Sequence, residues 1–330
     1  MKRPTLEVVA ARAGVSKSSV SRVINGETTV APRIRDVVMR AVRELGYVPN
    51  AAARNLVTRR TDAVAVVVSD PPQGVVSDDP LFSTVVRTVS RELEAAGKRV
   101  VLMLAESDRS RTRVERYVAG GHVDGVMLVA LHGTDPLPAA LARMGLPLAS
   151  FNRTCAQDVP YVGLDNAGGA TLAVQHLLER GRRRIATVTG PLDLFEARER
   201  LDGYRRTLRD SGRRSIVALG DFTRASGAEA MQQLLEDDPA LDAVFAANDL
   251  MAIGALRTLR LAGRRVPEDV AVVGFDDIEA AAYTSPALTS VRSPMADQAT
   301  ATVRLLLGLV EGGPGGPVIM PNELVVRETT

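Results

Sequence analysis

Two groups of polar side chains stand at spacings that could support chemistry, one near the amino terminus and one spread over the rest of the chain. Near the amino terminus, helical spacing from residue 16 to 25 places Val20, Val23 and Ile24 on one face. The opposite face carries two cations and several short polar groups: Lys17, Ser18, Ser21, Arg22 and Asn25. Such an outward face is what a helix entering the DNA major groove requires.

The second group follows short apolar runs that are predicted to be buried strands. Its members are Ser69 and Asp70, Asn152 and Arg153, Asn248 and Asp249, and Asp276 and Asp277. Ligands of open α/β sheets bind beyond the carboxyl ends of the strands, so we expect these residues to converge on one cleft. Asp, Asn and Arg beside an aromatic ring suit a sugar, another polyhydroxylated compound or a nucleoside-like compound. The alternatives are that Asp276 or Asp277 caps the start of a helix and that Asn248 caps the end of a strand.

The first sixty residues contain the elements that would position the basic helix. Thr5 is a good N-cap for a short helix that ends at Gly14, and Ser16 can cap the next helix. A third helix, from Pro32 to about Leu45, supplies apolar residues that close a small core. Two helices joined by a three-residue turn that contains Gly predict a helix-turn-helix. A three-helix module that binds other proteins is the alternative.

Charge separates this segment from the rest of the chain and favours nucleic acid as its partner. Residues 1–60 contain twelve Lys and Arg and four Asp and Glu, a balance of +8. The remaining 270 residues therefore carry −6 of the total net charge of +2. A solvated basic tail would lack the apolar periodicity of this segment, so the charge indicates a folded nucleic-acid-binding domain.

From residue 61 onward, short apolar runs alternate with helical patterns, which predicts buried parallel sheets in a doubly wound α/β fold. Eight strands are expected from residue 63 to 274, with a break near Val159 that indicates two subdomains of four or five strands each. A last strand is expected at 322–327, and the chain is expected to cross between the subdomains near residues 160, 290 and 322.

The motifs AGVSKSSVSRVIN and ELGYVPNAAARNL resemble the DNA-binding domain of the LacI/GalR family of bacterial transcription regulators. The similarity continues through VGLDNAGGATLAVQHLLERG, ARERLDGY, FAANDLMAIGAL, VVGFDDIE and LTSVRSPM, so it covers essentially the whole chain. It implies an all-α helix-turn-helix domain at 1–49 and a hinge at 50–60. Residues 61–330 would then form a periplasmic-binding-protein-like core that binds a small effector and dimerises.

The resemblance also assigns residues to DNA. Lys17, Ser18 and Arg22 match positions that read base edges, and Arg22 is suited to a bidentate contact with guanine. The positions that mostly hold phosphates are Thr5, Leu6, Ser16, Ser21, Asn25 and Tyr47. Ala31 departs from the family pattern, because relatives often have Ser or Thr there, and Pro32 is expected to supply part of the helix start instead.

The hinge segment is predicted to be a helix that cannot fold alone. Asn50 can cap a helix that runs to Leu56, but isolated helices of this length are marginal in water. The resemblance implies that two such helices pair in the minor groove of the operator, where Asn50, Ala53 and Leu56 contact DNA and Leu56 wedges into the central base step. The alternative for Leu56 is an apolar linker residue that packs against the regulatory domain.

For the effector, the resemblance implies hydrogen bonds from Arg200, Asn248 and Asp276 and an aromatic surface from Phe222. Phe82 could supply a second aromatic wall, and Ser69, Asp70, Asn152 and Arg153 complete the expected set. Phe222 could instead be ordinary core. Phe195 and Glu196 stand where many relatives have small polar residues, so the effector of a relative cannot be assumed.

An enzyme and an exported solute-binding protein are the competing function classes. The three His residues are scattered, and neither a phosphate-binding loop nor a GxSxG motif occurs. The single Cys, the lack of a signal-peptide pattern and the lack of a long apolar run predict a cytoplasmic protein without a membrane segment. We therefore expect a homodimeric repressor of pseudo-palindromic operator DNA, controlled by a small molecule, with no cofactor and no metal. The chain ends without leucine heptads, so a tetramerising coiled coil is not expected.

Overall fold

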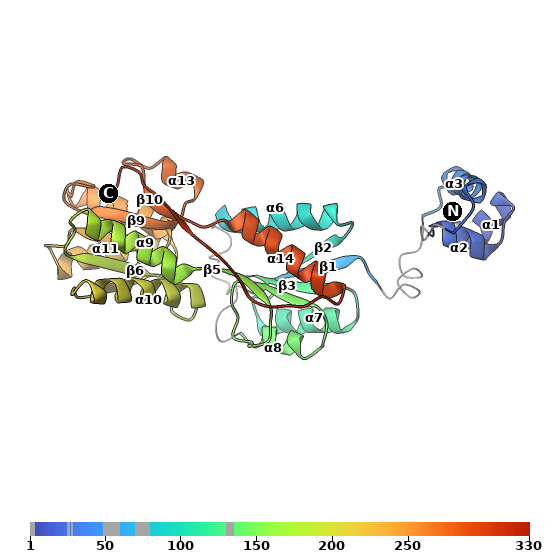
Figure 1. Ribbon diagram of the computed structural model, residues 1–330, viewed down its shortest axis with the longest axis horizontal. Coiled ribbons are helices and arrows are strands. Elements are labelled where there is room, and N and C mark those ends of the chain that lie inside the picture. Colours follow the sequence, from blue (N-terminus) through green and yellow to red (C-terminus); the bar gives the residue numbers. More distant parts are fainter. Residues whose placement is uncertain (1–3, 25–26, 28, 49–59, 70–79, 130–134) are drawn as a thin grey trace. The chain divides into compact units, whose positions relative to one another are not determined.

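The structure is a computed structural model that describes residues 4–24, 27, 29–48, 60–69, 80–129 and 135–330 (Figure 1). Contacts divide the chain into two units, Met1–Thr61 and Asp62–Thr330. The predicted hinge residues 50–59 lie outside the described residues. Each unit is therefore considered by itself.

Three helices form the first unit: α1 (Leu6–Ala13), α2 (Lys17–Ile24) and α3 (Pro32–Leu45). Their buried core consists of Val9, Ala10, Ala13, Val20, Val23, Val38, Ala41 and Tyr47. Gly14 (φ +64°) and Gly46 (φ +58°) end α1 and α3 in the left-handed conformation that Gly adopts without strain. The helix-turn-helix and the start of α3 at Pro32 are thus as predicted from the sequence.

The second unit contains two six-stranded sheets. The first sheet has the order β11-β5-β4-β3-β1-β2, and all its strand pairs are parallel. Its strands are β1 (Ala63–Val68), β2 (Arg99–Leu104), β3 (Gly125–Val129), β4 (Leu148–Phe151), β5 (Tyr161–Leu164) and β11 (Val318–Met320). We call this sheet and its helices the N-terminal subdomain.

The second sheet has the order β12-β10-β9-β8-β6-β7, with β12 antiparallel to β10 and the other pairs parallel. Its strands are β6 (Ile185–Thr189), β7 (Ile216–Leu219), β8 (Ala243–Ala246), β9 (Ala271–Asp276), β10 (Thr289–Arg292) and β12 (Glu323–Val325). We call this sheet and its helices the C-terminal subdomain.

Helices cover both faces of each sheet, which is the doubly wound arrangement expected from the apolar runs. In the N-terminal subdomain, α6 (Pro80–Ala95) and α14 (Met295–Val310) share one face, and α7 (Asp108–Ala119) and α8 (Leu137–Ala142) the other (Figure 1). In the C-terminal subdomain, α9 (Asn166–Glu179) and α10 (Phe195–Asp210) cover one face. The opposite face is covered by α11 (Arg224–Asp237), α12 (Asp249–Leu261) and the short α13 (Glu279–Ala282).

The chain passes between the subdomains three times, after β5, after β10 and between β11 and β12. The expectation of four or five strands per subdomain was too low, because β5, β10 and β11 were not predicted. These strands have only three or four residues, and β10 (TSVR) has no continuous apolar run. Their burial depends on neighbours that are distant in the sequence.

Within the part of the chain that the structure describes, no helix is long and apolar enough to cross a membrane. The same residues contain no group of three or more His, Cys, Asp or Glu placed to hold a metal ion.

Candidate functional site

The outward face of α2 displays the polar residues that the sequence placed there. Ser16 caps the helix, since its Oγ accepts a hydrogen bond from the backbone N–H of Ser19 at 3.1 Å. The same hydroxyl lies 2.8 Å from the Oγ of Ser18. Lys17, Ser18 and Arg22 are exposed, whereas Val20 and Val23 are buried in the three-helix core. The helix can therefore present these side chains to a groove without unfolding the core.

Both cations of this face are paired with acids at the surface. The ammonium of Lys17 forms an ion pair with Glu7, and the Nε of Arg22 lies 3.9 Å from a carboxylate oxygen of Glu27. The hydrogen bond from Lys17 is the main reason that the pKa of the Glu7 carboxyl lies below its usual value. Exposed pairs of this kind are weak, so phosphates or base edges can replace the carboxylates as partners.

The other predicted DNA contacts differ in their placement. Thr5 occupies the N-cap position of α1, but its hydroxyl donates to the Glu7 carboxylate at 2.9 Å and does not bond to the helix backbone. Leu6 is half-buried against the core, Ser21 is half-exposed, and Tyr47 is buried in the core. Four predicted contacts lie outside the described residues: Asn25, Asn50, Ala53 and Leu56.

In the second unit, residues just beyond the strand ends have unusual backbone conformations. Asn152 (φ 77°) follows β4, Phe222 (φ 71°) lies beyond β7, and Asp276 (φ 103°) and Asp277 (φ 55°) end and follow β9. Residues other than Gly rarely have positive φ, and such strained residues cluster at functional sites. Three of the four were predicted to contact an effector. The strain supports a binding site where these strands end.

Arg200 is the centre of a buried network in the C-terminal subdomain. Its Nη1 donates to the carbonyl oxygen of Ala247 at 2.5 Å, and its Nε donates to Oδ1 of Asn166 at 3.0 Å. Its Nη2 lies 3.5 Å from Oδ1 of Asp276, and its guanidinium stacks 3.7 Å from the centre of the Phe275 ring. The structure therefore fixes the guanidinium tightly before any ligand is bound.

Asp276 is buried beside this guanidinium. Its Oδ1 also accepts a hydrogen bond from the Oγ of Ser293 at 3.1 Å. Burial raises the pKa of the Asp276 carboxyl, although the positive charge of Arg200 opposes this shift. Asp276 does not cap a helix, since Ile278 is the N-cap of α13. The carboxylate is thus available as a hydrogen-bond acceptor held in a fixed position.

Asn248 and Phe222 are linked to each other. Asn248 is the N-cap of α12, and its Oδ1 accepts from the backbone N–H of Met251 at 2.9 Å. Its Nδ2 donates to the carbonyl oxygen of Phe222 at 3.0 Å. Asn248 therefore caps the start of a helix, whereas the alternative drawn from the sequence was a cap at the end of a strand. The Phe222 ring is half-buried, and the Arg200 guanidinium lies 5.9 Å from its centre. Asn248 thereby holds the backbone of Phe222 in place next to Arg200.

The remaining predicted residues lie in the N-terminal subdomain. Ser69 is buried and hydrogen-bonds through its hydroxyl to the Asp135 carboxylate, while Phe82 packs against the core between α6, α14 and the sheet. Asp70 lies outside the described residues. Asn152 and Arg153 follow β4 and reach the C-terminal subdomain, where they contact the first turns of α10. These two residues therefore belong to the junction between the subdomains.

Two acids beside the predicted residues have structural partners. Asp249 is fully buried and accepts hydrogen bonds from the Oγ of Ser290 at 2.6 Å and from the N–H of Ile278 at 2.8 Å. Burial, and then the nearby charge of Asp276, raises the pKa of the Asp249 carboxyl well above its usual value. Asp277 forms ion pairs with Arg292 and Arg327 at 2.8 and 2.6 Å. Both acids hold the β9–α13 turn in place.

Sequence reasoning did not predict contacts for Glu196, Glu199 and Asn166. Glu196 is half-buried at the junction, and burial raises the pKa of its carboxyl, although Arg200 and Asn152 nearby oppose this shift. Glu199 accepts a hydrogen bond from Nδ2 of Asn166 at 3.1 Å. The signal in the sequence was the departure from the family pattern at residues 195 and 196.

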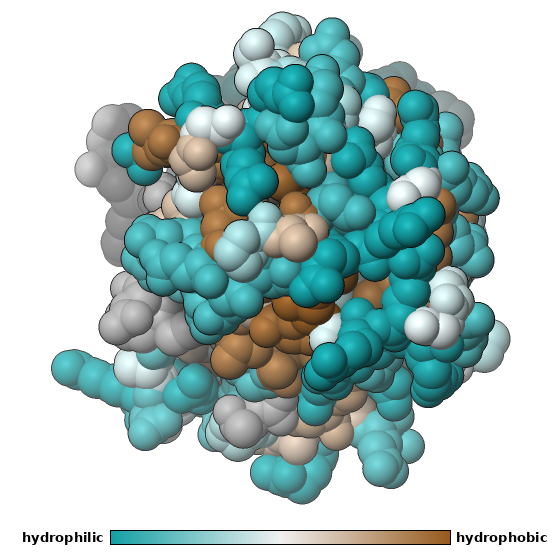
Figure 2. Space-filling model, turned by 90° about the vertical axis from the view of Figure 1, so that its left-hand side faces the viewer, coloured by the Kyte–Doolittle hydropathy of each residue, from teal (hydrophilic) through white to brown (hydrophobic). Residues whose placement is uncertain are grey.

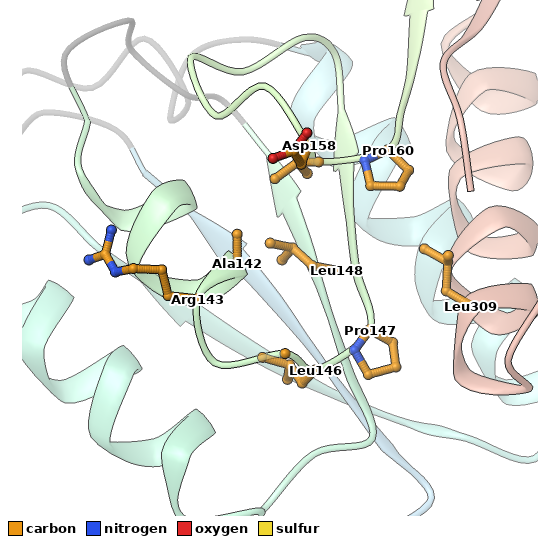
Figure 3. Close-up of a pocket in the computed structure, with 10 residues that line it drawn as sticks. Ala142, Arg143, Leu146, Pro147, Leu148, Asp158, Pro160 and Leu309 are labelled. Carbon is orange, nitrogen blue, oxygen red and sulfur yellow. The ribbon is translucent and has the colours of Figure 1, made fainter. Parts of the chain in front are cut away.

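A separate pocket of about 530 Å³ lies on the N-terminal subdomain, beside the amino end of β4 and the carboxyl end of α14 (Figure 3). It is lined mainly by apolar residues, including Leu146, Leu148 and Leu309, and Arg143 extends away from the other lining side chains. It includes none of the predicted effector residues. Polar ligands need convergent polar groups, so the junction suits them better than this pocket.

Comparisons with known proteins agree with both parts of the structure. Residues 5–50 match the family described as bacterial regulatory proteins, lacI family, and residues 174–330 match a periplasmic binding protein-like domain. The HTH-type transcriptional regulator CelR of Thermobifida fusca is 47% identical over 99% of this chain and 98% of its own length.

Two solved structures extend the comparison to the fold. A transcriptional regulator CelR–cellobiose complex has 45% identity and a TM-score of 0.77, covering 99% of this chain and 100% of that one. The lac repressor dimer bound to operator and the anti-inducer ONPF has 29% identity and a TM-score of 0.88, covering 100% of this chain and 99% of that one.

Proposed function

The chain belongs to the LacI family of bacterial regulatory proteins, and we propose on this basis that it is a cytoplasmic repressor and not an enzyme. It is a DNA-binding transcription regulator. In the proposal, a homodimer binds a pseudo-palindromic double-stranded operator, and a sugar bound at the subdomain junction controls that binding. The observation that carries the proposal is the identity of 47% with a transcriptional regulator over both the helix-turn-helix unit and the effector-binding unit.

The DNA-binding part of the proposal rests on the charge and exposure of α2. Lys17, Ser18 and Arg22 are exposed on the face opposite the core, in a segment of net charge +8. We assign base contacts to these three residues. The phosphate contacts assigned from the family resemblance are Thr5, Leu6, Ser16, Ser21, Asn25 and Tyr47, and the hinge contacts are Asn50, Ala53 and Leu56. For Tyr47 the burial of the residue leaves at most the edge of the side chain for DNA.

The effector part of the proposal rests on the network around Arg200. A guanidinium, a carboxylate from Asp276 and an aromatic ring from Phe222 lie together and are held by other protein groups. Hydroxyl-rich ligands need such fixed donors and acceptors beside an apolar ring face. Because a solved CelR structure contains cellobiose, a disaccharide of glucose is the first effector to test, and nucleosides are the alternative class.

The homodimer part of the proposal is supported by the similarity to the lac repressor, whose solved structure is a dimer bound to operator. Two copies of the chain would form a two-fold symmetric pair, which matches a pseudo-palindromic operator. Leu219, Leu261 and Tyr283 of the C-terminal subdomain are 69%, 71% and 80% exposed, but they lie at three different elements. Figure 2, which faces this end of the molecule, shows apolar side chains exposed among hydrophilic ones. Single exposed apolar residues are common on protein surfaces, so these residues do not by themselves locate the dimer interface.

The experiment that tests the proposal measures operator binding at several salt concentrations, with and without cellobiose. Contacts with 6–10 phosphates should lower the operator affinity by roughly 10³–10⁵ between 50 and 200 mM salt. Cellobiose should raise the melting temperature of the protein, since a ligand selective for the folded state stabilises it, and should change the operator affinity. A salt-independent affinity would refute DNA binding through phosphates. Stabilisation by a nucleoside but not by cellobiose would refute the sugar assignment.

A further inference from the structure

Five side chains connect the two subdomains directly at the end of β4. From the N-terminal subdomain, Asn152 lies beside the Glu196 carboxylate and acts to lower its pKa, and the Arg153 Nη1 lies 3.9 Å from Oε1 of Glu199. The Arg153 guanidinium also lies 5.0 Å from the centre of the Phe195 ring. Phe195, Glu196 and Glu199 all belong to the first two turns of α10 in the C-terminal subdomain. We call these five residues the junction clasp.

The N-terminal half of the clasp is held rigidly by its own subdomain. The Nε2 of Gln298, in α14, donates to Oδ1 of Asn152 at 2.6 Å and to the carbonyl oxygen of Val162 at 2.8 Å. The backbone N–H of Asn152 donates to the same carbonyl oxygen of Val162 at 2.9 Å. These bonds hold the Asn152 side chain and backbone in place at the end of β4.

The C-terminal half of the clasp is held by hydrogen bonds within its own subdomain. Nδ2 of Asn166 donates to Oε2 of Glu199, and Oδ1 of the same amide accepts from the Nε of Arg200. The clasp is therefore joined through one asparagine to the residue at the centre of the proposed effector site. The Arg198 guanidinium lies 4.5 Å from the centre of the Phe195 ring, but Arg198 belongs to α10 itself and does not connect the subdomains.

We propose that Arg153 is a positioning residue that, by contacting Glu199 and Phe195, holds the two subdomains in the effector-binding arrangement before the effector arrives. The proposal rests on the proposed function, in that the effector must contact residues of both subdomains. From the sequence we expected Arg153 to contact the effector; in this proposal it acts on effector affinity through the arrangement of the subdomains instead. Its replacement changes how often the binding-competent arrangement is populated.

The expected size of the effect follows from the two contacts of Arg153. Exposed ion pairs and exposed cation–π contacts are each weak, and both side chains of the ion pair are partly exposed. Together they correspond to roughly a 3- to 30-fold change in an equilibrium constant. The apparent dissociation constant of a ligand rises by the same factor when the population of the competent state falls.

The first test measures cellobiose binding by calorimetry for Arg153→Gln, Phe195→Leu and the double variant of the full chain. Arg153→Gln removes both contacts and should bind roughly 3- to 30-fold more weakly, whereas Phe195→Leu removes only the ring contact and should lose less. The double variant should bind no more weakly than Arg153→Gln, since the ring contact is already absent without Arg153. The matched control is Arg198→Gln, which removes an equal charge beside the same ring, and it should change affinity less than twofold. Independent, multiplying losses in the double variant would overturn the proposal.

The second test needs no effector. Hydrogen exchange of the effector-free protein should speed up in peptides covering residues 150–156 and 193–200 for Arg153→Gln, and should be unaltered for Arg198→Gln. Weaker cellobiose binding with unaltered exchange would show that Arg153 contacts the ligand directly, which would overturn the proposal. If wild-type protein does not bind cellobiose, the effector assignment fails, while the exchange experiment still decides whether the clasp exists.

Discussion

The pair formed by Arg200 and Asp276 gives a prediction whose magnitude can be worked out from the structure. We expect Arg200→Met to destabilise the second unit by about 3 kcal/mol. Met keeps an apolar contact with the Phe275 ring, but it loses the hydrogen bond to the Ala247 carbonyl oxygen and leaves Asp276 buried without a cation. Removing one partner of a buried ion pair costs about 3–5 kcal/mol. The separation of 3.5 Å favours the lower end of that range.

The loss should depend on pH in a defined direction. Burial already raises the pKa of Asp276, and removal of the Arg200 charge raises it further. A carboxyl group whose pKa is higher in the folded protein contributes stability that is present below its unfolded pKa and is lost as the pH rises through its folded pKa. The deficit of Arg200→Met relative to wild type should therefore be largest at alkaline pH and should shrink as the buffer becomes acidic.

Thermal unfolding followed by circular dichroism measures this effect. A loss of about 3 kcal/mol corresponds to a fall of roughly 6–12 °C in melting temperature for a unit of this size. Asp276→Asn in the Arg200→Met background removes the buried charge, so the double variant should lose at least about 1.5 kcal/mol less than the sum of the two single losses. Single losses that add to within about 0.5 kcal/mol would refute the reasoning, since uncoupled sites behave in that way.

Three other changes test separate parts of the molecule. Leu56→Ala should weaken specific operator binding and leave non-specific binding nearly unchanged, because a wedge acts only on the central base step; equal losses in a filter-binding assay would argue against the wedge. Gly190→Ala should weaken effector binding roughly tenfold, since a Cβ there would lie 2.1–2.7 Å from three atoms of the Phe222 ring and displace it. Gly308→Ala is the control, because a Cβ there meets nothing within 4 Å. Equal effector affinities of the two variants in calorimetry would contradict the role of the ring. Asp249→Asn should become more stable relative to wild type as the pH rises from 5 to 8, because the wild-type protein loses stability when its buried carboxyl, whose pKa is raised, gives up its proton. Urea unfolding measures the free energy of unfolding of both proteins. A difference that stays constant over this pH range would be inconsistent with the prediction.

The helical unit could be predicted from the sequence because its determinants are local. The apolar spacing at Val9, Ala10 and Ala13 and the Gly residues at the helix ends predicted α1 and α3 with their observed ends. Thr5 occupies the predicted N-cap position, but its hydroxyl accepts no hydrogen bond from the helix backbone and donates to the Glu7 carboxylate. Sequence periodicity places a residue at a helix end but carries no information on the partners of its side chain.

The candidate site was predictable as a set of positions but not as a set of contacts. Polar residues after apolar strands predicted that Asn152, Asn248 and Asp276 lie at strand ends, and the structure places them there. The contact of Asn152 with Glu196 joins residues 44 positions apart in different subdomains, and Gln298 orients it from a third region of the chain. Such contacts depend on how the chain crosses between the sheets. Three strands beside those crossings, β5, β10 and β11, were not predicted, because their burial depends on neighbours that are distant in the sequence.

The late position of α14 and β11 in the chain has a consequence for synthesis on the ribosome. The sheet that begins at residue 63 receives α14 and its edge strand β11 only when residues 295–320 have been made. At about 5–20 residues per second, β5 emerges about 7–30 s before the end of α14. During that interval Val64, Met127 and Ala149 lack the cover that Ala299, Val303 and Leu306 later provide. A chain that stopped before residue 295 would leave the part of one sheet face that α14 covers exposed to water, although most of the other subdomain would be complete.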